Sequence, residues 1–357
     1  MVWQFWGRAA EASWTEKSRA LFLCGKHRIK GVSARATYGP CSTHCLSFSE
    51  LSRTINLSPM SSLSHHFIMF CGFLLLAFSM EAVPLRAQES PYMVTYDHYL
   101  EEPGSLEIEY FSTFGTQRAG NDFHAFWTEF EYGATAWWTT ELYLDGQSTF
   151  DDSTIFTGFR LENRFRPLQH EHFINPVLYI EYEQISEADK IVKEVEGHDV
   201  EADHAVPNAI ARQDHDYELE FKLLLSGNFK GWNIAENTIA TKNLTGADPW
   251  EFGYAIGTSR PLALKASAKP CSLCRENFAG GIEMYGGLGD RYSFGLPDTS
   301  HYLAPVAIWN SPSNWAVRVS PGFGLNHNSH RFLLRWGLSR EFPGFGATLA
   351  RWLGDHS

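Results

Sequence analysis

The sequence predicts an all-β fold, a single antiparallel up-and-down transmembrane β-barrel of about 12 strands. Segments of about ten residues alternate between apolar and polar side chains. In residues 331–342, for example, the apolar positions are Phe332, Leu334, Trp336 and Leu338. The connections alternate between short and long, and the last predicted strand ends on an aromatic residue. A secreted sandwich or a soluble lipid-binding barrel would also alternate, but aromatics near strand ends and a hairpin meander favour the transmembrane barrel.

The chain begins with segments that we expect to lie outside the barrel. Residues 1–59 show no sustained periodicity and are expected to be a mis-assigned or disordered extension. Residues 60–87 are typical of a signal peptide, because the apolar run Phe67–Phe78 is shorter than the roughly 20 residues of a spanning helix. Leu85–Ala87 is the expected cleavage site, and a buried core helix is the alternative for the run. Residues 88–103 are then a periplasmic N-terminal segment.

The barrel is expected over residues 104–342, followed by a tail at 343–357. Turn residues separate the strands, and the only weak helical candidate is 189–195. An even number of strands places both barrel termini in the periplasm. The predicted strands are 104–115, 122–133, 135–145, 153–166, 175–185, 215–226, 230–240, 250–260, 277–287, 300–309, 314–321 and 329–342.

Composition limits the partners. The net charge is −12, and no basic cluster follows residue 87, so nucleic acid is not expected as a partner. The expected location is the outer membrane of a Gram-negative envelope. The expected partners are outer-membrane lipid, the barrel-assembly machinery and a small-molecule solute, with no cofactor. Cys271 and Cys274 are the cysteines that remain after export, and an oxidising compartment favours a local disulfide between them. A redox or metal role is the alternative.

Charged residues on the predicted inner face are the candidate functional residues, because opposite charges across a narrow lumen would form a selective constriction. The alternative is a salt-bridged plug that conducts nothing. Pairing of the last strand with the first is expected to bring Arg331 and Arg335 beside Glu107 and Glu109. The full predicted set is Glu107, Glu109, Glu129, Glu131, Glu141, Arg160, Arg164, Glu181, Glu183, Glu218, Glu220, Arg318, Arg331 and Arg335.

Two other clusters contain residues of the kinds that bind metals or catalyse hydrolysis. The loop 186–214 and the following residues include His198, His204 and His215 among several carboxylates, but their spacing matches no closed zinc motif, so no metal site is expected. Ser329 lies beside His330, as a hydrolase would require. No third orienting group accompanies the pair, so catalysis is not expected.

Four segments resemble a known bacterial family: residues 130–135 (FEYGAT), 175–183 (NPVLYIEYE), 232–237 (WNIAEN) and 250–262 (WEFGYAIGTSRPL). They are similar to the outer-membrane proteins assigned to the phenol-degradation meta-pathway, over roughly residues 100–342. The resemblance implies an outer-membrane channel for the passive uptake of small solutes, aromatic or hydrophobic ones among them. The alternatives are a non-conducting structural or surface-interaction barrel and, third, an outer-membrane lipid hydrolase.

Overall fold

The computed structural model describes residues 90–117, 120–191, 197, 206–269 and 271–354. These residues belong to one compact unit, Leu74–Ser357. The expected extension at 1–59, the expected signal peptide at 60–87 and the loop histidines His198 and His204 all lie outside the described residues.

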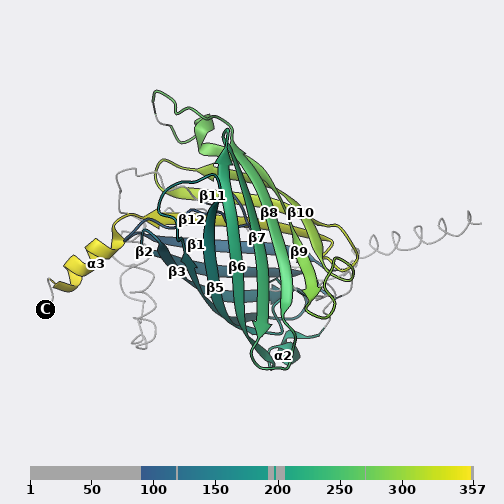
Figure 1. The fold of residues 1–357 in the computed structure, drawn as a ribbon. Coiled ribbons are helices and arrows are strands. Elements are labelled where there is room, and N and C mark those ends of the chain that lie inside the picture. The colour runs from purple at the N-terminus through teal and green to yellow at the C-terminus, as the bar shows by residue number, and fades with distance from the viewer. Residues whose placement is uncertain (1–89, 118–119, 192–196, 198–205, 270, 355–357) are drawn as a thin grey trace, which may run out of the picture. The chain divides into compact units, whose positions relative to one another are not determined.

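Twelve antiparallel strands close into a barrel in which each strand pairs with its neighbours in sequence and β12 pairs with β1 (Figure 1). This confirms the predicted fold class. The strands are β1 (Leu106–Thr116), β2 (Phe123–Thr135), β3 (Trp138–Thr149), β4 (Thr154–Phe165), β5 (Asn175–Ser186), β6 (His215–Phe229), β7 (Trp232–Asn243), β8 (Glu251–Pro261), β9 (Phe278–Asp290), β10 (His301–Asn310), β11 (Trp315–Gly324) and β12 (Phe332–Phe342).

The two faces of the barrel wall differ as the alternation predicts. Outward-facing apolar side chains are exposed around the circumference, among them Leu142, Ile180, Ile256 and Trp336. Inward-facing positions of the same strands are buried and mostly polar. Exposure of this continuous apolar exterior to water would be unfavourable, whereas contact with lipid is favourable. The chain is therefore a transmembrane β-barrel.

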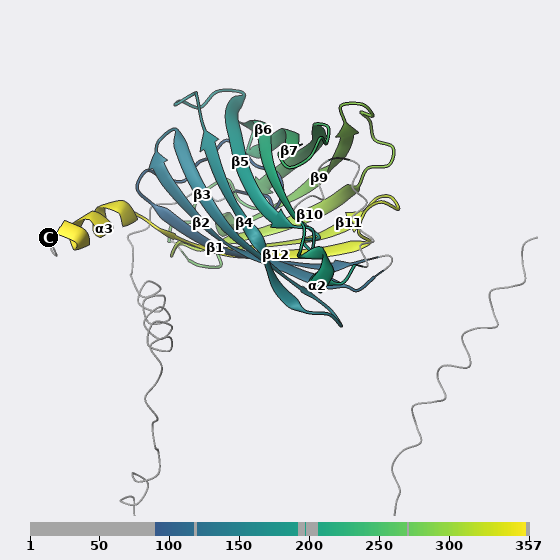
Figure 2. The ribbon, with the colours of Figure 1, turned by 90° about the horizontal axis from the view of Figure 1, so that it is seen from below.

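The two ends of the barrel differ in their connections (Figure 2). We call the end where β1 begins and β12 finishes the terminal end, and the opposite end the loop end. At the terminal end β2 and β3 are separated by two residues, as are β6 and β7. The longest connection, between β5 and β6, is at the loop end and contains the short helix α2 (Asn208–Ala211). The expected helix at 189–195 is not found in its described part, residues 189–191.

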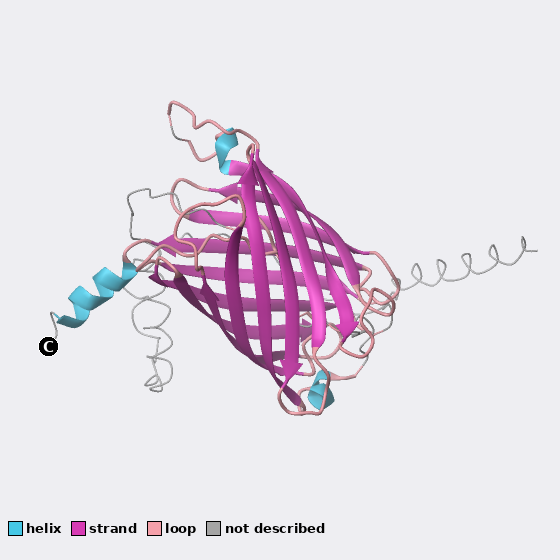
Figure 3. Ribbon diagram, in the orientation of Figure 1, coloured by secondary structure: helices cyan, strands magenta, loops and turns pink. Residues whose placement is uncertain are grey.

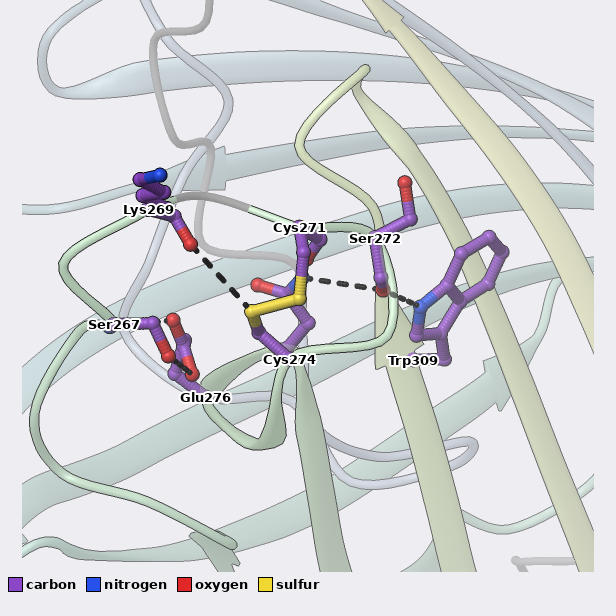
Figure 4. Close-up of a disulfide and its surroundings, with 8 residues drawn as sticks. Ser267, Lys269, Cys271, Ser272, Cys274, Glu276 and Trp309 are labelled. Carbon is purple, nitrogen blue, oxygen red and sulfur yellow. Dashed lines mark hydrogen bonds between the residues drawn. A yellow bond between two sulfur atoms is a disulfide. The ribbon is translucent and has the colours of Figure 1, made fainter.

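Two further features lie outside the strands at the terminal end (Figure 3). The β8–β9 connection contains the 3₁₀ turn η2 (Arg275–Asn277) and the disulfide Cys271–Cys274, whose Cα atoms are 5.2 Å apart (Figure 4). Trp309 Nε1 donates to Ser272 O at 2.7 Å and ties this loop to β10. After β12 the chain continues into helix α3 (Phe345–Gly354). No helix of the described residues is long and apolar enough to cross a membrane.

Candidate functional site

The barrel lumen is the candidate site, and most of the predicted charged residues face it. Eleven of the fourteen are buried on inward positions: Glu107, Glu109, Glu141, Arg160, Arg164, Glu181, Glu183, Glu218, Glu220, Arg318 and Arg335. Glu129 and Glu131 are half-buried on β2. Arg331 is exposed and precedes β12 at the loop end, so it is not a lumen residue.

The strand register places carboxylates opposite one another on strand after strand. Nine of ten aligned positions are acidic: Glu341, Glu107, Glu131, Glu141, Glu162, Glu181, Glu220, Thr241, Glu251 and Asp290. We call this set the glutamate row. It begins at the terminal end of β12 and β1 and reaches the loop end of β8 and β9. Like charges directly opposite one another destabilise a sheet, so the row requires compensation from other groups.

Basic side chains on the inner face provide part of that compensation. Arg164 Nε donates to Glu141 Oε1 at 2.7 Å, and its Nη2 lies 2.6 Å from Glu131 Oε1. The same Nε lies 3.0 Å from Glu162 Oε1. One guanidinium thus bridges three members of the row. Lys222 Nζ lies 2.7 Å from Glu220 Oε1.

The register changes the predicted pairing of the closing strands. Glu109 lies opposite Ser339, and its carboxylate pairs with Arg318 of β11 rather than with β12. Arg335 lies opposite Thr113, four residue pairs farther toward the loop end. Its Nη1 donates to Tyr285 OH at 3.0 Å. The expectation that Arg331 and Arg335 lie beside Glu107 and Glu109 is therefore wrong, because closure occurs in a register that the alternation alone does not fix.

The segment before β1, residues 90–105, packs against the inner wall, and we call it the plug. Its centre is held by one carboxylate. Glu283 of β9 accepts hydrogen bonds from the backbone N–H groups of Met93, Val94 and Thr95 at 2.9, 3.0 and 2.7 Å. Residues 88–103 were expected to be a periplasmic segment outside the barrel. In the described part, residues 90–103, the lumen wall instead accepts hydrogen bonds from the backbone.

Two tyrosines fix the plug on both sides of this carboxylate, Tyr92 through its side chain and Tyr96 through its backbone. Tyr92 OH donates to Asn233 Oδ1 at 2.7 Å, and its ring packs against Gly257, where an added Cβ would lie 2.5 Å from Cε1. Tyr96 N donates to Asn237 Oδ1 at 2.7 Å, and Asn237 Nδ2 donates back to Tyr96 O at 2.8 Å. The plug therefore forms reciprocal bonds with β7 without joining the sheet.

The end of the plug nearest β1 carries a buried acid and a buried imidazole. Burial raises the pKa of Asp97 to about 7, although the Tyr99 N–H and Arg164 both favour the charged carboxylate. His98 Nδ1 lies 2.5 Å from Ser226 Oγ, and its Nε2 lies 3.0 Å from Glu171 Oε2. Burial lowers the pKa of His98, while Glu171 acts in the opposite direction.

At the loop end, part of the β5–β6 connection enters the lumen. Residues 188–191 of the β5–β6 connection are buried between the wall strands. Lys190 N donates to Gln147 Oε1 at 3.0 Å, and Lys190 O lies 3.0 Å from His330 Nε2. Ile191 joins an apolar cluster inside the lumen with Phe123, Ala125, Ile239, Ala255, Tyr285, Tyr302, Ala304 and Leu333, against which Val94 of the plug packs.

Two cavities border the plug. A cavity of about 120 Å³ lies between the plug and the charged wall, lined by Tyr96, Glu129, Tyr143, Arg160 and Arg318 among others. Drug-sized ligands occupy pockets of roughly 300–1,000 Å³. A larger cavity of about 430 Å³ lies at the terminal end, lined by Tyr99, Asn233, Pro261, Trp315 and Glu341 among others. These two cavities therefore lie beside the plug, the smaller one against the charged wall and the larger one at the terminal end.

Two Ser–His arrangements that could suggest catalysis contain a buried serine. Ser329 is fully buried and its Oγ bonds to His301 O at 2.8 Å, which makes it a structural residue of the β11–β12 connection. The hydrogen-bonded group Ser226–His98–Glu171 was not predicted, because His98 lies in the plug and the plug was expected to lie outside the barrel. Ser226 is 3% exposed and lines neither of the two cavities described above. Both arrangements hold elements together.

The comparisons with known proteins give fold-level likeness only. No family model and no curated protein sequence matches the chain. Among solved structures it is similar to the COG4313 outer membrane channel from Pseudomonas putida F1, at 12% identity, TM-score 0.42, and 70% and 100% coverage of the two chains. It is also similar to the KdgM porin (8%, 0.41, 66% and 99%) and to LpxR from Salmonella typhimurium (9%, 0.34, 66% and 99%). The resemblance to the phenol-degradation family stays a prediction.

Proposed function

We propose that the protein is an outer-membrane channel for small solutes whose lumen is closed by its own N-terminal plug. The observation that carries the proposal is the way in which the plug is held. Glu283, Asn233 and Asn237 bind it through side chains of the wall, and no strand pairing anchors it between Ser90 and Ser105. Such contacts can exchange for water when the segment moves, while the barrel keeps all its strand pairs.

Aromatic side chains lie beside the charged wall, and they support the proposal that the solute is a small aromatic or hydrophobic molecule. Phe111 and Trp127 stack inside the lumen with ring centroids 4.0 Å apart. Arg160 lies over the Tyr143 ring at 4.1 Å from its centroid. Apolar pocket walls with a few polar groups are typical of small-molecule sites, and displacement of the plug would uncover this surface.

The filled lumen also favours a second candidate, a non-conducting barrel with a structural or surface-interaction role. In that case the plug is a permanent part of the core, and its polar contacts serve stability. The lipid hydrolase is the weakest candidate, because the serines that lie near a histidine, Ser112, Ser226 and Ser329, are all buried.

Conductance in planar bilayers separates the two main candidates. We expect the wild-type protein to conduct weakly, and the double variant Glu283→Ala/Asn237→Ala to conduct in larger and longer steps. Glu218→Gln is the matched control, because Glu218 is a buried inner-wall carboxylate that accepts from Asn243 at 3.2 Å, away from the plug. If the folded double variant conducts no more than the control, the channel proposal fails and the non-conducting barrel is supported.

A further inference from the structure

We propose that α3 is an interfacial helix whose apolar face docks on the phospholipid leaflet at the terminal end of the barrel. Four residues of the helix are large and apolar: Phe345, Leu349, Trp352 and Leu353. With about 3.6 residues per turn, these positions share one face of about 100°, which we call the apolar stripe. The opposite face carries Arg351, the only charged residue of the helix. This pattern is typical of a helix that lies between lipid and water.

The barrel leaves the apolar stripe largely exposed. Leu349, Trp352 and Leu353 are 41%, 60% and 54% exposed. All residues of α3 are described by the structure, and none of them is buried. In Figures 1 and 2 the helix extends away from the strands at the terminal end. Exposure of such a face to water is unfavourable, and contact with an apolar environment would relieve it.

The first turn of α3 is fixed to the rim of the barrel. β12 ends at Phe342, and Gly344 turns the chain with φ +65°, a conformation that favours glycine. Gly346 N then donates to Gly104 O at 2.9 Å, just before β1. Gly346 also lies against β2, because a Cβ added there would be 2.6 Å from Tyr132 OH. The helix is therefore held at the level of the rim and is not carried by a free tail.

Aromatic side chains at the same rim indicate where the membrane surface lies. Trp137, Trp138 and Phe165 form a cluster at the β2–β3 hairpin and the end of β4, with ring centroids 6.2–6.4 Å apart. Tryptophan and tyrosine are enriched where the hydrocarbon core meets the lipid headgroups. The chain passes from Phe342, the last outward position of β12, to Phe345 within three residues. The apolar stripe thus continues the lipid-facing wall at the interfacial level.

A lipid leaflet suits the stripe better than a protein partner does. Stable protein interfaces take roughly 20–30 residues from each partner, whereas α3 offers four large apolar side chains. A leaflet requires no such area, because the barrel already keeps the helix beside the membrane and only its docking has to be favourable. Arg351 on the polar face suits the anionic phosphates of the headgroups.

Photo-crosslinking identifies what covers the stripe. The full chain is placed in nanodiscs of phosphatidylethanolamine and phosphatidylglycerol, with a benzophenone amino acid in place of Leu349. We expect the probe to add the mass of a phospholipid, and the same probe in place of Leu338, on the lipid-facing wall, is the positive control. In place of Ala347, on the opposite face of α3, the probe should give at least about threefold less lipid adduct.

The crosslinked product decides between the occupants. Attachment of the probe at position 349 to the barrel itself or to a second copy of the chain would overturn the proposal in favour of a protein contact. Equal lipid adducts from positions 347 and 349 would overturn it as well, because the stripe would then have no preferred side.

Hydrogen–deuterium exchange of the α3 amides measures the docking. In nanodiscs, Leu349→Gln should speed exchange at residues 350–353 by at least about tenfold, because burial of one leucine side chain favours docking by that factor or more. Ala347→Gln, the matched control, introduces the same residue on the polar face and should exchange as wild type does. Equal exchange in the two variants would contradict the docking. Neither experiment requires conductance, so the outcome is independent of the channel proposal.

Discussion

Glu283→Ala is the sharpest test of how the plug is held. The carboxylate accepts three backbone hydrogen bonds, and the donor Thr95 is 2% exposed. A hydrogen bond to a charged group contributes about 1.5–3 kcal/mol net, and a buried donor left without a partner costs about as much. Bonds that share one acceptor are not additive. A loss of about 3 kcal/mol in the free energy of plug docking is therefore a conservative expectation.

Hydrogen–deuterium exchange measures this quantity at the amides concerned. A loss of about 3 kcal/mol corresponds to roughly a 100-fold faster exchange, since each 1.4 kcal/mol is a factor of ten. The increase should be confined to peptides covering residues 92–97, with the strand amides unchanged. Glu283→Gln keeps one carbonyl acceptor and should give an intermediate result.

Glu218→Ala controls for the general effect of removing a buried lumen carboxylate. Its exchange in residues 92–97 should match wild type. If Glu283→Ala changes exchange at Met93, Val94 and Thr95 by less than about threefold, the carboxylate does not hold the plug. The docking energy must then come from the packing of Tyr92 and Val94.

Three further predictions concern other parts of the barrel. Leu142→Arg and Ile180→Arg place charge on the lipid face and should each cost about 2–4 kcal/mol in the unfolding free energy of the lipid-embedded barrel. Arg318→Ala leaves Glu109 buried without its partner and should cost about 3–5 kcal/mol. Adding Glu109→Gln should restore part of this loss, as measured by thermal unfolding. Docking of the plug raises the pKa of Asp97 from 3.8 to about 7. The protonated carboxyl therefore favours docking at low pH, and this contribution is lost as pH rises from about 4 to about 7. Hydrogen–deuterium exchange of the plug amides should increase over that range.

The strands and their faces could be predicted from the sequence because lipid imposes a strict period of two. One residue of the last strand, Leu333, departs from this alternation, and the departure has a physical cause. Leu333 stands at an inward position, where the alternation predicts a polar residue. It packs into the apolar cluster that Ile191 reaches from the loop end. Periodicity identifies the face of Leu333, but it cannot identify the partner, because Ile191 lies in a connection without any period.

The plug could not be predicted for a related reason. Residues 90–105 alternate weakly and carry Tyr92, Tyr96, His98 and Tyr99 at spacings that match neither a strand nor a helix. Their order depends on contacts with β7 and β9, which lie more than 130 residues away. The density of tyrosine in a short segment expected to be solvated was the available signal. Aromatic side chains with a polar end often bind where one side is packed and the other is hydrogen-bonded.

The glutamate row shows why candidate residues could be found but their pairing could not. The hairpin between β2 and β3 pairs Thr135 with Trp138, and continuing that register would place Glu131 opposite Leu142. A bulge between Gly133 and Thr135 shifts the register by one, so Glu131 faces Glu141 instead. One unpaired residue thus decides whether a carboxylate meets a leucine or another carboxylate that Arg164 can bridge. The charges of the lumen follow from composition and alternation, whereas their mutual contacts follow from bulges and closure, which the pattern of side chains does not encode.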